Sequence, residues 1–281
     1  MPDFKKLAHV ADVDFATSFG LSAEKLIKML GVVEPIKKAP TATLKQYKIT
    51  GTAADNSTRT AGQEIKASNI TREVVGTKEI KLKPYRRTST LEDIQANGYA
   101  SEVADKDAEL LALIQKDIKN DIVEALESGT GTAKGTNMVE AATAAWAELQ
   151  NATEGYSAAI PVYFANPVDF AKCIGESNVF TAFGVSYLEN WAGLGNLIST
   201  AAVPAGKVYV TAANNLKVYY LDAANADGFN FETDETGFIA VTHAAEAVNL
   251  AYETVAWTAL TIFPEYPEFV VKATITAKAT Q

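Results

Sequence analysis

The chain has 281 residues, of which 48% are hydrophobic and 21% charged, so it is long enough for one large domain or two small ones with a real core. A formal net charge of −9 argues against attraction of the whole surface to nucleic acid, and the single cysteine excludes a scaffold of internal disulfides. The sequence shows no signal peptide and no run near the roughly 20 apolar residues of a membrane span, so we expect a soluble protein made in a cytoplasm, with no membrane partner.

The first forty residues predict one short helix and an extended arm. Residues 22–30, SAEKLIKML, are amphipathic and end at Gly31, and Pro35 and Pro40 then favour extended backbone. Because this segment carries too little apolar surface to fold alone, we expect an arm that lies on another surface. Residues 1–48 hold eight lysines against five acids, which allows contact with an acidic surface such as that of another copy.

A long hairpin with a polar tip follows the arm. Residues 44–50, LKQYKIT, are strand-like, with Tyr47 and Ile49 on one face. Residues 51–63 hold no apolar side chain larger than alanine, and strand character returns from Glu64 and strengthens through EVVGTKEIKLKPYRR. Such a hairpin buries little by itself, so it either remains a mobile surface element or lies on a partner.

Two helices come next. The stretch STLEDIQANG predicts a short helix with Ser89 and Glu92 at capping-box spacing and Gly98 at its end. Residues 101–128 then run without a breaker, and a helix of that length spans about 40 Å. Asp107 is among four acids of its first turns, where the helix dipole favours negative charge. One face carries a narrow apolar stripe suited to lying across a sheet, formed by Leu110, Leu111, Ile114, Ile118, Ile122, Ala125 and Leu126.

The second half of the chain predicts a helix and then a series of short strands. Residues 138–149 form an amphipathic helix, and IPVYFANPVDFAKC predicts a buried strand and a short helix with Asn166 as cap and Pro167 at its first position. Short strands with Asn and Gly turns fill residues 199–241, and two apolar strands around Pro264 close the chain.

The glycine-rich stretch ESGTGTAKGTN, residues 127–137, has the composition of a phosphate-binding loop but not its order. It reads Lys134-Gly135-Thr136 where such a loop has Gly-Lys-Thr, and it follows a helix C-terminus, which repels phosphate. We therefore predict a loop that carries the chain from one domain into the next, with Gly129 as the C-cap of the long helix.

No catalytic, cofactor or metal site emerges from the sequence. Only two histidines, His9 and His243, and one cysteine, Cys173, are available, so a zinc site built on several such ligands is implausible. His243 follows the apolar run FIAV and is expected at the edge of the core, and Cys173 is expected to pack among apolar neighbours. We predict a protein that is not an enzyme and that holds no cofactor and no metal.

The order of these parts resembles the major capsid proteins of tailed bacteriophages, which have the α+β Hong Kong 97-like fold. The segments that carry the resemblance are KEIKLKPYRRTSTLEDIQAN before the long helix, LESGTGT at its exit, IPVYFANPVDFAKC, and the closing EYPEFVVKATI. The resemblance covers nearly the whole chain. It implies an N-terminal arm over residues 1–43, an extended loop (E-loop) over 44–70, a peripheral (P) domain over 71–135 with a spine helix at about 101–128, an axial (A) domain over 136–249, and a return to the P-domain over 250–281.

The resemblance implies a head-shell protein of the virion, made in the cytoplasm of the bacterial host. It would self-assemble into the hexamers and pentamers of an icosahedral shell that encloses double-stranded DNA without sequence-specific binding. It would work with a portal and, because residues 1–43 are too short to include a scaffolding domain, with a separate scaffolding protein.

The resemblance also implies contacts between subunits. The polar tip of the hairpin would lie on an adjacent subunit through Asp55, Asn56 and Arg59. Some relatives cross-link an E-loop lysine to a P-domain asparagine with the help of a buried glutamate. Lys66 and Asn249 are the candidates here, but no matching glutamate is evident because Ala256 stands in that region, so we do not expect the cross-link.

Two other classes of protein remain open. An encapsulin, a bacterial nanocompartment shell, has the same fold and packages cargo enzymes instead of a genome. A monomeric enzyme or carbohydrate-binding protein would use residues 157–250, where acids outnumber lysines nine to three.

Overall fold

A computed structural model describes residues 4–32, 34–39, 41–154, 160–174, 178–223 and 230–276. Its α-helices are α1 (Phe4–Met29), α2 (Leu91–Asn97), α3 (Tyr99–Leu126), α4 (Met138–Thr153) and α5 (Pro167–Phe170). Its strands are β1 (Ile36–Lys38), β2 (Thr43–Thr52), β3 (Asn69–Glu79), β4 (Lys83–Thr90), β5 (Gly131–Gly135), β6 (Pro161–Ala165), β7 (Val179–Ala182), β8 (Val185–Trp191), β9 (Gly195–Ser199), β10 (Lys207–Ala212), β11 (Leu216–Leu221), β12 (Glu232–Thr233), β13 (Ile239–Glu246), β14 (Ala251–Thr258), β15 (Thr261–Pro264) and β16 (Val270–Ile275).

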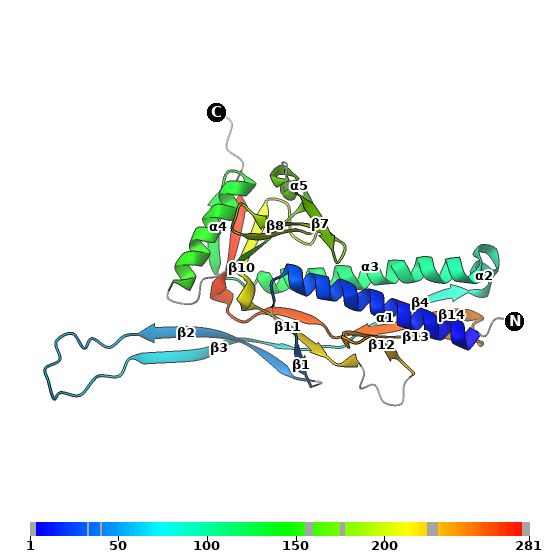
Figure 1. Cartoon of the computed structure of the whole chain (residues 1–281), viewed down its shortest axis with the longest axis horizontal. Coiled ribbons are helices and arrows are strands. Elements are labelled where there is room, and N and C mark those ends of the chain that lie inside the picture. The colour runs from blue at the N-terminus through cyan, green and yellow to red at the C-terminus, as the bar shows by residue number, and fades with distance from the viewer. Residues whose placement is uncertain are drawn as a thin grey trace.

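The described strands form four sheets in an elongated molecule (Figure 1). Seven strands, in the order β5-β16-β10-β6-β9-β8-β7, form a mixed sheet. Helix α4 packs on this sheet, and the two form one hydrophobic cluster. Four strands, β12-β13-β14-β4, lie against α1 and α3, and three more, β1-β11-β15, continue beneath them. The β2–β3 hairpin projects from one end of the molecule (Figure 1). Among the described helices, none has the length and apolar character needed to span a bilayer.

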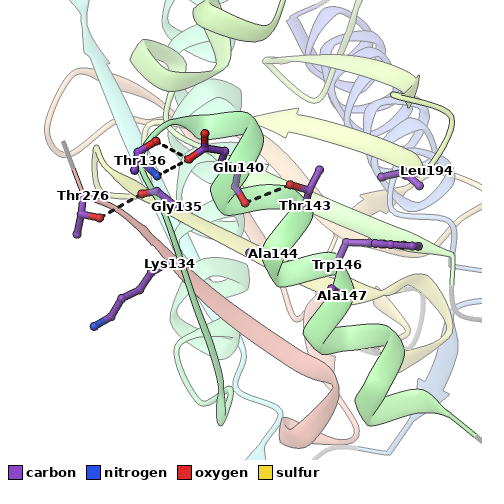
Figure 2. A pocket seen from close by; sticks show the side chains of 10 residues that line it. All are labelled: Lys134, Gly135, Thr136, Glu140, Thr143, Ala144, Trp146, Ala147, Leu194 and Thr276. Atoms are coloured by element: carbon purple, nitrogen blue, oxygen red, sulfur yellow. Dashed lines mark hydrogen bonds between the residues drawn. The ribbon is translucent and has the colours of Figure 1, made fainter. Parts of the chain in front are cut away.

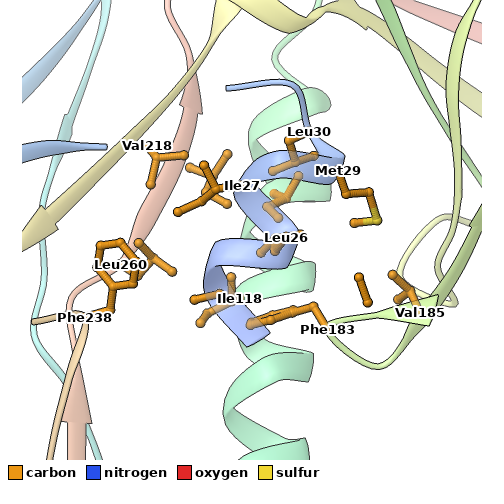
Figure 3. Close-up of a cluster of buried hydrophobic side chains, with 14 of the residues drawn as sticks. Leu26, Ile27, Met29, Leu30, Ile118, Phe183, Val185, Val218, Phe238 and Leu260 are labelled. Atoms are coloured by element: carbon orange, nitrogen blue, oxygen red, sulfur yellow. The ribbon is translucent and has the colours of Figure 1, made fainter. Parts of the chain in front are cut away.

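The long helix α3 has the predicted position and the predicted buried face. It begins at Tyr99, two residues before the expected start, and ends at Leu126. Ile114, Ile118 and Leu126 are fully or almost fully buried, and the main hydrophobic cluster of the protein forms around this stripe. Figure 3 shows Ile118 in a cluster with side chains of α1, with Phe183 of the β7–β8 turn and, on the other side, with Val218, Phe238 and Leu260.

The prediction of a short helix at residues 22–30 is wrong, because α1 runs for 26 residues and is docked rather than free. It lies beside α3 and runs in the same direction (Figure 1), and it buries Phe15, Phe19, Leu26 and Leu30 in the main cluster. Glycine weakens a helix interior, yet α1 continues through Gly20. A Cβ atom at Gly20 would lie 1.6 Å from a carboxylate oxygen of Asp234, so glycine leaves room for that side chain against the helix.

The predicted hairpin is present, but its return strand is displaced. Strand β2 contains the expected residues 44–50, whereas β3 starts at Asn69 instead of Glu64 and continues to Glu79. The run EVVGTKEIKLKPYRR is therefore not one strand, because β4 starts separately at Lys83 and pairs with β14. The chain changes sheet at Ile80, which is buried and packs in a small cluster with Leu44 on β2.

The glycine-rich stretch forms a strand where a loop was predicted. Residues 131–135 are β5, which pairs in parallel with β16 at the edge of the seven-stranded sheet. Gly129 is not the predicted C-cap, because α3 is capped by Glu127; a Cβ atom at Gly129 would lie 2.6 Å from Val270, so glycine permits close packing. Gly135 has the same role, because its Cβ would lie 2.2 Å from the backbone nitrogen of Ala141 on α4.

The predictions for helix ends are partly correct. Asn166 caps α5 through a 3.0 Å bond that its Oδ1 accepts from the backbone N–H of Val168, with Pro167 at the first position as expected. Gly98 ends α2 with a φ of 84°. The cap of α2 is Thr90 rather than Ser89, since Ser89 turns inward and accepts a hydrogen bond from Arg87.

Docking of α1 predicts unequal costs for two leucines of the same helix. Leu26 is 2% exposed and Leu21 is 56% exposed, so Leu26→Ala should lower the free energy of unfolding by about 2–5 kcal/mol and Leu21→Ala by well under about 1 kcal/mol. Chemical denaturation of both variants measures the difference. Equal and small costs would mean that α1 is a free arm after all.

Candidate functional site

The β2–β3 hairpin is fixed at its base by one buried glutamine. The amide of Gln46 donates to the hydroxyl of Ser128, just after α3, and to the carbonyl of Pro264 on β15, both at 3.2 Å. The strand pairing shifts register after Gln46, and the facing residue is Gly76, where a Cβ would lie 2.5 Å from the Gln46 side-chain oxygen. These two hydrogen bonds fix the base of the hairpin to the protein body, and Gly76 leaves room for the Gln46 side chain.

A second contact holds the next residues of the hairpin. The backbone N–H of Tyr47 donates to the carbonyl of Glu265 at 2.9 Å, and Arg72 forms an ion pair with the Glu265 carboxylate at 3.1 Å. The Arg72 guanidinium also lies 3.5 Å from the centre of the Tyr47 ring, in a cation–π arrangement. Backbone, charge and ring contacts thus set the direction in which the hairpin leaves the body.

Beyond this base the hairpin is exposed, including large apolar side chains. Ile70 is 72% exposed, and Ile65, Val74 and Val75 are exposed as well. A protein seldom leaves a row of such side chains in water on an element with a single layer. The two outer edges of β2 and β3 also remain unpaired among the described strands, so the hairpin can accept a partner on its faces or its edges.

The tip itself is shaped by polar side chains. Asp55 accepts hydrogen bonds from the backbone and hydroxyl of Ser57 at 2.8 and 2.6 Å, which lower the pKa of its carboxyl. Asn56 bridges the tip by pairing with the N–H and carbonyl of Lys66 at 2.9 and 3.1 Å. Arg59 donates to the carbonyl of Gln63 at 2.7 Å. The three predicted contact residues therefore lie together on the tip and give it a defined form.

The two candidates for a cross-link lie far apart in one chain. Lys66 is on the hairpin tip at one end of the molecule, and Asn249 is in the turn between β13 and β14 near the other end (Figure 1). Ala256, at the position where a helping glutamate was sought, is buried on β14. The geometry within one subunit does not bring this pair together.

A cluster of buried charges joins α1 to α3 and the four-stranded sheet. Both ring nitrogens of His243 on β13 contact carboxylates: Nδ1 lies 2.6 Å from Asp12 on α1, and Nε2 lies 2.8 Å from Asp107 on α3. Arg87 on β4 donates to Asp107 at 2.9 and 2.7 Å, and Thr254 donates to it at 2.9 Å. We call these residues, with Asp12 and His243, the histidine clamp.

The clamp favours a charged histidine. Burial disfavours the imidazolium, but the hydrogen bonds and charges of Asp107 and Asp12 outweigh that effect and raise the pKa of His243. Burial likewise works against the Asp107 carboxylate, yet His243 and Arg87 hold its pKa below the usual value. For Asp12, burial dominates and raises its pKa. The sequence predicted His243 at the edge of the core; its side chain is fully buried and it ties α1 down.

One signal in the sequence could have revealed the clamp. Asp107 lies on the apolar stripe of α3, three residues before Leu110, whereas Asp105 does not. Helix-dipole reasoning treated both acids alike, although an acid on a buried face needs a partner inside the protein. Asp12 offered no comparable signal, because the helix around it was not predicted.

The glycine-rich stretch borders an open pocket, which Figure 2 shows between β5, α4 and β16. Glu140, in the first turn of α4, accepts hydrogen bonds from the backbone N–H of Thr136 at 3.0 Å and from its hydroxyl. Asn137 caps the same turn through the N–H of Glu140 at 2.9 Å. A carboxylate thus stands at the helix N-terminus, where a phosphate-binding loop would need free N–H groups.

The described residues contain no group of three or more His, Cys, Asp or Glu side chains that could hold a metal ion. Cys173 packs against the α4 cluster as predicted, and burial raises the pKa of its thiol, which makes it less nucleophilic. His9 lies on the surface, 3.2 Å from Glu232.

No protein-family model matches the sequence, and no curated protein sequence matches it. Solved structures do match. A virus-like particle from Pyrococcus furiosus is 16% identical with a TM-score of 0.54, covering 92% of this chain and 97% of the other. An encapsulin from Synechococcus elongatus is 8% identical with a TM-score of 0.55, covering 91% and 90%. The capsid of cyanophage A-1(L) is 12% identical with a TM-score of 0.56, covering 90% and 93%. The chain therefore has the Hong Kong 97-like fold of capsid-type shell proteins, and the predicted α+β fold is confirmed.

The histidine clamp predicts a pH-dependent stability. A group whose pKa is raised on folding stabilises the protein fully below its ordinary value, 6.5 for histidine, and loses that contribution as the pH rises through the raised value. A tenfold increase in the proton affinity of the folded state corresponds to about 1.4 kcal/mol of stability. The free energy of unfolding should therefore fall as the pH rises above 6.5 in the wild type, and this fall should be absent in His243→Gln.

His9→Gln is the matched control, because it removes the other histidine, which is exposed. Denaturation curves from about pH 5.5 to about pH 9 for the three proteins provide the measurement. The same slope in the wild type and in His243→Gln would contradict the account, and Asp12→Asn offers a milder variant should His243→Gln fail to fold.

Proposed function

We propose that this chain is the subunit of a closed protein shell and that the shell is the head of a tailed bacteriophage. The observation that carries the proposal is the hairpin, which is anchored firmly at Gln46 yet exposes Ile70 and its neighbours to water. An element with a fixed direction and no core of its own fits a subunit that lies on its neighbours. The capsid-type fold, which extends over most of the chain, supports the same conclusion.

The proposed division of the chain follows that fold. Residues 44–70 would be the E-loop, residues 71–135 with α3 the P-domain, residues 136–249 the A-domain, and residues 250–281 the return to the P-domain. The segment 1–43, predicted to be an arm, would instead contribute α1 to the P-domain side of the subunit.

The proposed assembly consists of hexamers and pentamers around double-stranded DNA. A separate scaffolding protein and a portal would take part, and the chain would be made in the bacterial cytoplasm before entering the virion. A net charge of −9 is compatible with a shell that encloses a genome without binding it electrostatically over its whole surface. In this role the chain acts structurally and not as a catalyst.

Encapsulins have the same fold, so the contents of the shell separate the two assignments. Particles that carry this chain should be isolated from the producing bacterium, treated with nuclease and opened. Protected double-stranded DNA and a portal protein are the expected contents. A cargo enzyme without DNA would instead identify an encapsulin, and a stable 30.0 kDa monomer that turns over a substrate would exclude a shell.

Removing the hairpin tip should block assembly but leave the fold intact. Thr52 and Asn69 face each other in the last pair of the hairpin, so an Asn-Gly turn can replace residues 53–68. We expect the melting temperature to stay within about 3 °C, because none of residues 53–68 is buried. Negative-stain microscopy and sedimentation should show shells for the wild type and none for this variant.

Val168→Ser, which changes an exposed apolar residue on α5, is the control for this experiment. Shells of normal size from the tip variant would refute a role for Asp55, Asn56 and Arg59 in contacts between subunits.

The shell should be held together without covalent links. Because Ala256 stands where a helping glutamate was sought, boiled particles should give one band near 30.0 kDa on a denaturing gel. A ladder of larger bands that disappears in Lys66→Arg would show that the cross-link forms after all.

A further inference from the structure

A pocket of about 530 Å³ with two lysines in its lining lies between α3 and the seven-stranded sheet. The β7–β8 turn reaches down to α3 at Gly184, where a Cβ would lie only 3.4 Å from the amine of Lys119. Lys116 and Asn120 line the helix side of the pocket, and Ser186, Ser199 and Thr200 line the sheet side. Its described lining contains no carboxylate, although the chain as a whole has nine more acids than basic residues.

The two lysines in this pocket lack a counter-charge. They are three residues apart on α3, so their side chains lie on the same face of the helix. Within the described parts of the chain neither forms an ion pair, and the only acceptor for Lys119 is the carbonyl of Phe183 at 3.4 Å. Each ammonium group therefore keeps hydrogen-bond donors for another molecule.

The opposite wall offers neutral donors. Ser199 is only 7% exposed, and its hydroxyl makes no hydrogen bond to any described residue. That hydroxyl is not among the fully enclosed polar atoms without a partner, so it is accessible to a ligand in the pocket. Ser186 lines the same wall and its hydroxyl is likewise unbonded among the described residues. Two cations and two hydroxyls thus converge on one open volume.

Electrostatics inside the pocket favour an anion. Burial and the neighbouring charge of Lys116 both lower the pKa of Lys119, so the empty pocket is unfavourable for its ammonium form. A bound anion would relieve the repulsion between the two lysines. Tetrahedral oxyanions match this donor set, because lysine acts as a point charge for phosphate and the serines can donate to the remaining oxygens.

We propose that the Lys116–Lys119 pocket binds a backbone phosphate of the nucleic acid that the shell encloses. The proposal rests on the proposed function, and it places this side of α3 toward the interior of the shell. A local phosphate site in a wall of negative net charge would hold segments of the packaged DNA in place without condensing it.

The test compares two lysine pairs with identical spacing. Lys116→Gln with Lys119→Gln removes the pocket charges, and Lys25→Gln with Lys28→Gln removes two exposed lysines three residues apart on α1. Binding of a fluorescent duplex of about 20 base pairs to the full-length chain is followed by anisotropy over a range of salt concentrations. The pocket variant should bind at least about fivefold more weakly, with a log–log salt slope reduced by about 1–2, and the α1 variant should bind like the wild type.

Inorganic phosphate gives an independent readout. It should compete with the duplex in the wild type and in the α1 variant but not in the pocket variant. An equal loss of duplex affinity in the two variants would show an effect of net charge alone and overturn the proposal. The proposal would also be overturned if acetate competed with the duplex as effectively as phosphate. Electron microscopy separates the two proposals. If the pocket variant forms normal shells and binds DNA as tightly as the wild type, only the phosphate site is refuted. If none of the proteins forms shells, the proposed function is refuted.

Discussion

The apolar face of α3 must be covered, and the rest of the structure is arranged to cover it. Ile114, Ile118 and Leu126 would otherwise lie in water along a helix of 28 residues. One flank is covered by α1, the other by the β7–β8 turn, and the strands that follow Leu216 and Leu260 cover it from below. Each of these elements comes from a distant part of the sequence, so the helix joins the chain into one body. The base of the hairpin then attaches beside its end, at Ser128.

The hairpin, unlike α3, leaves its apolar side chains uncovered within the subunit. It has no second layer, its apolar side chains are exposed, and its tip holds its shape through polar contacts such as those of Asp55 and Asn56. In the proposed shell such an element would be useful, because the hydrogen bonds of Gln46 fix the direction in which the hairpin leaves the body and so where it would meet a neighbour.

Elements whose signal is local could be predicted from the sequence. The stripe of α3 and the Asn166-Pro167 cap carry their signal within a few residues. Elements that depend on remote partners could not. The first half of α1 was not predicted, and the contacts that hold it, such as that of Asp12 with His243, join it to residues far along the chain. Strands β7 to β9 were missed although their turns carry glycine signals, since Gly184 and Gly193 both have positive φ. In the histidine clamp, the place of Asp107 on the stripe of α3 indicates a buried acid, but its partners Asp12 and His243 lie on distant segments that no local spacing connects to it.

The most direct test of the account is a cryo-electron microscopy map of the assembled protein in which β2 and β3 can be traced. The account predicts that each hairpin crosses a subunit boundary and that Asp55, Asn56 and Arg59 contact the body of the adjacent copy, while α1 stays docked along α3 of its own chain. A hairpin folded back on its own subunit, or one that points into solvent with no neighbour beside it, would contradict the central claim.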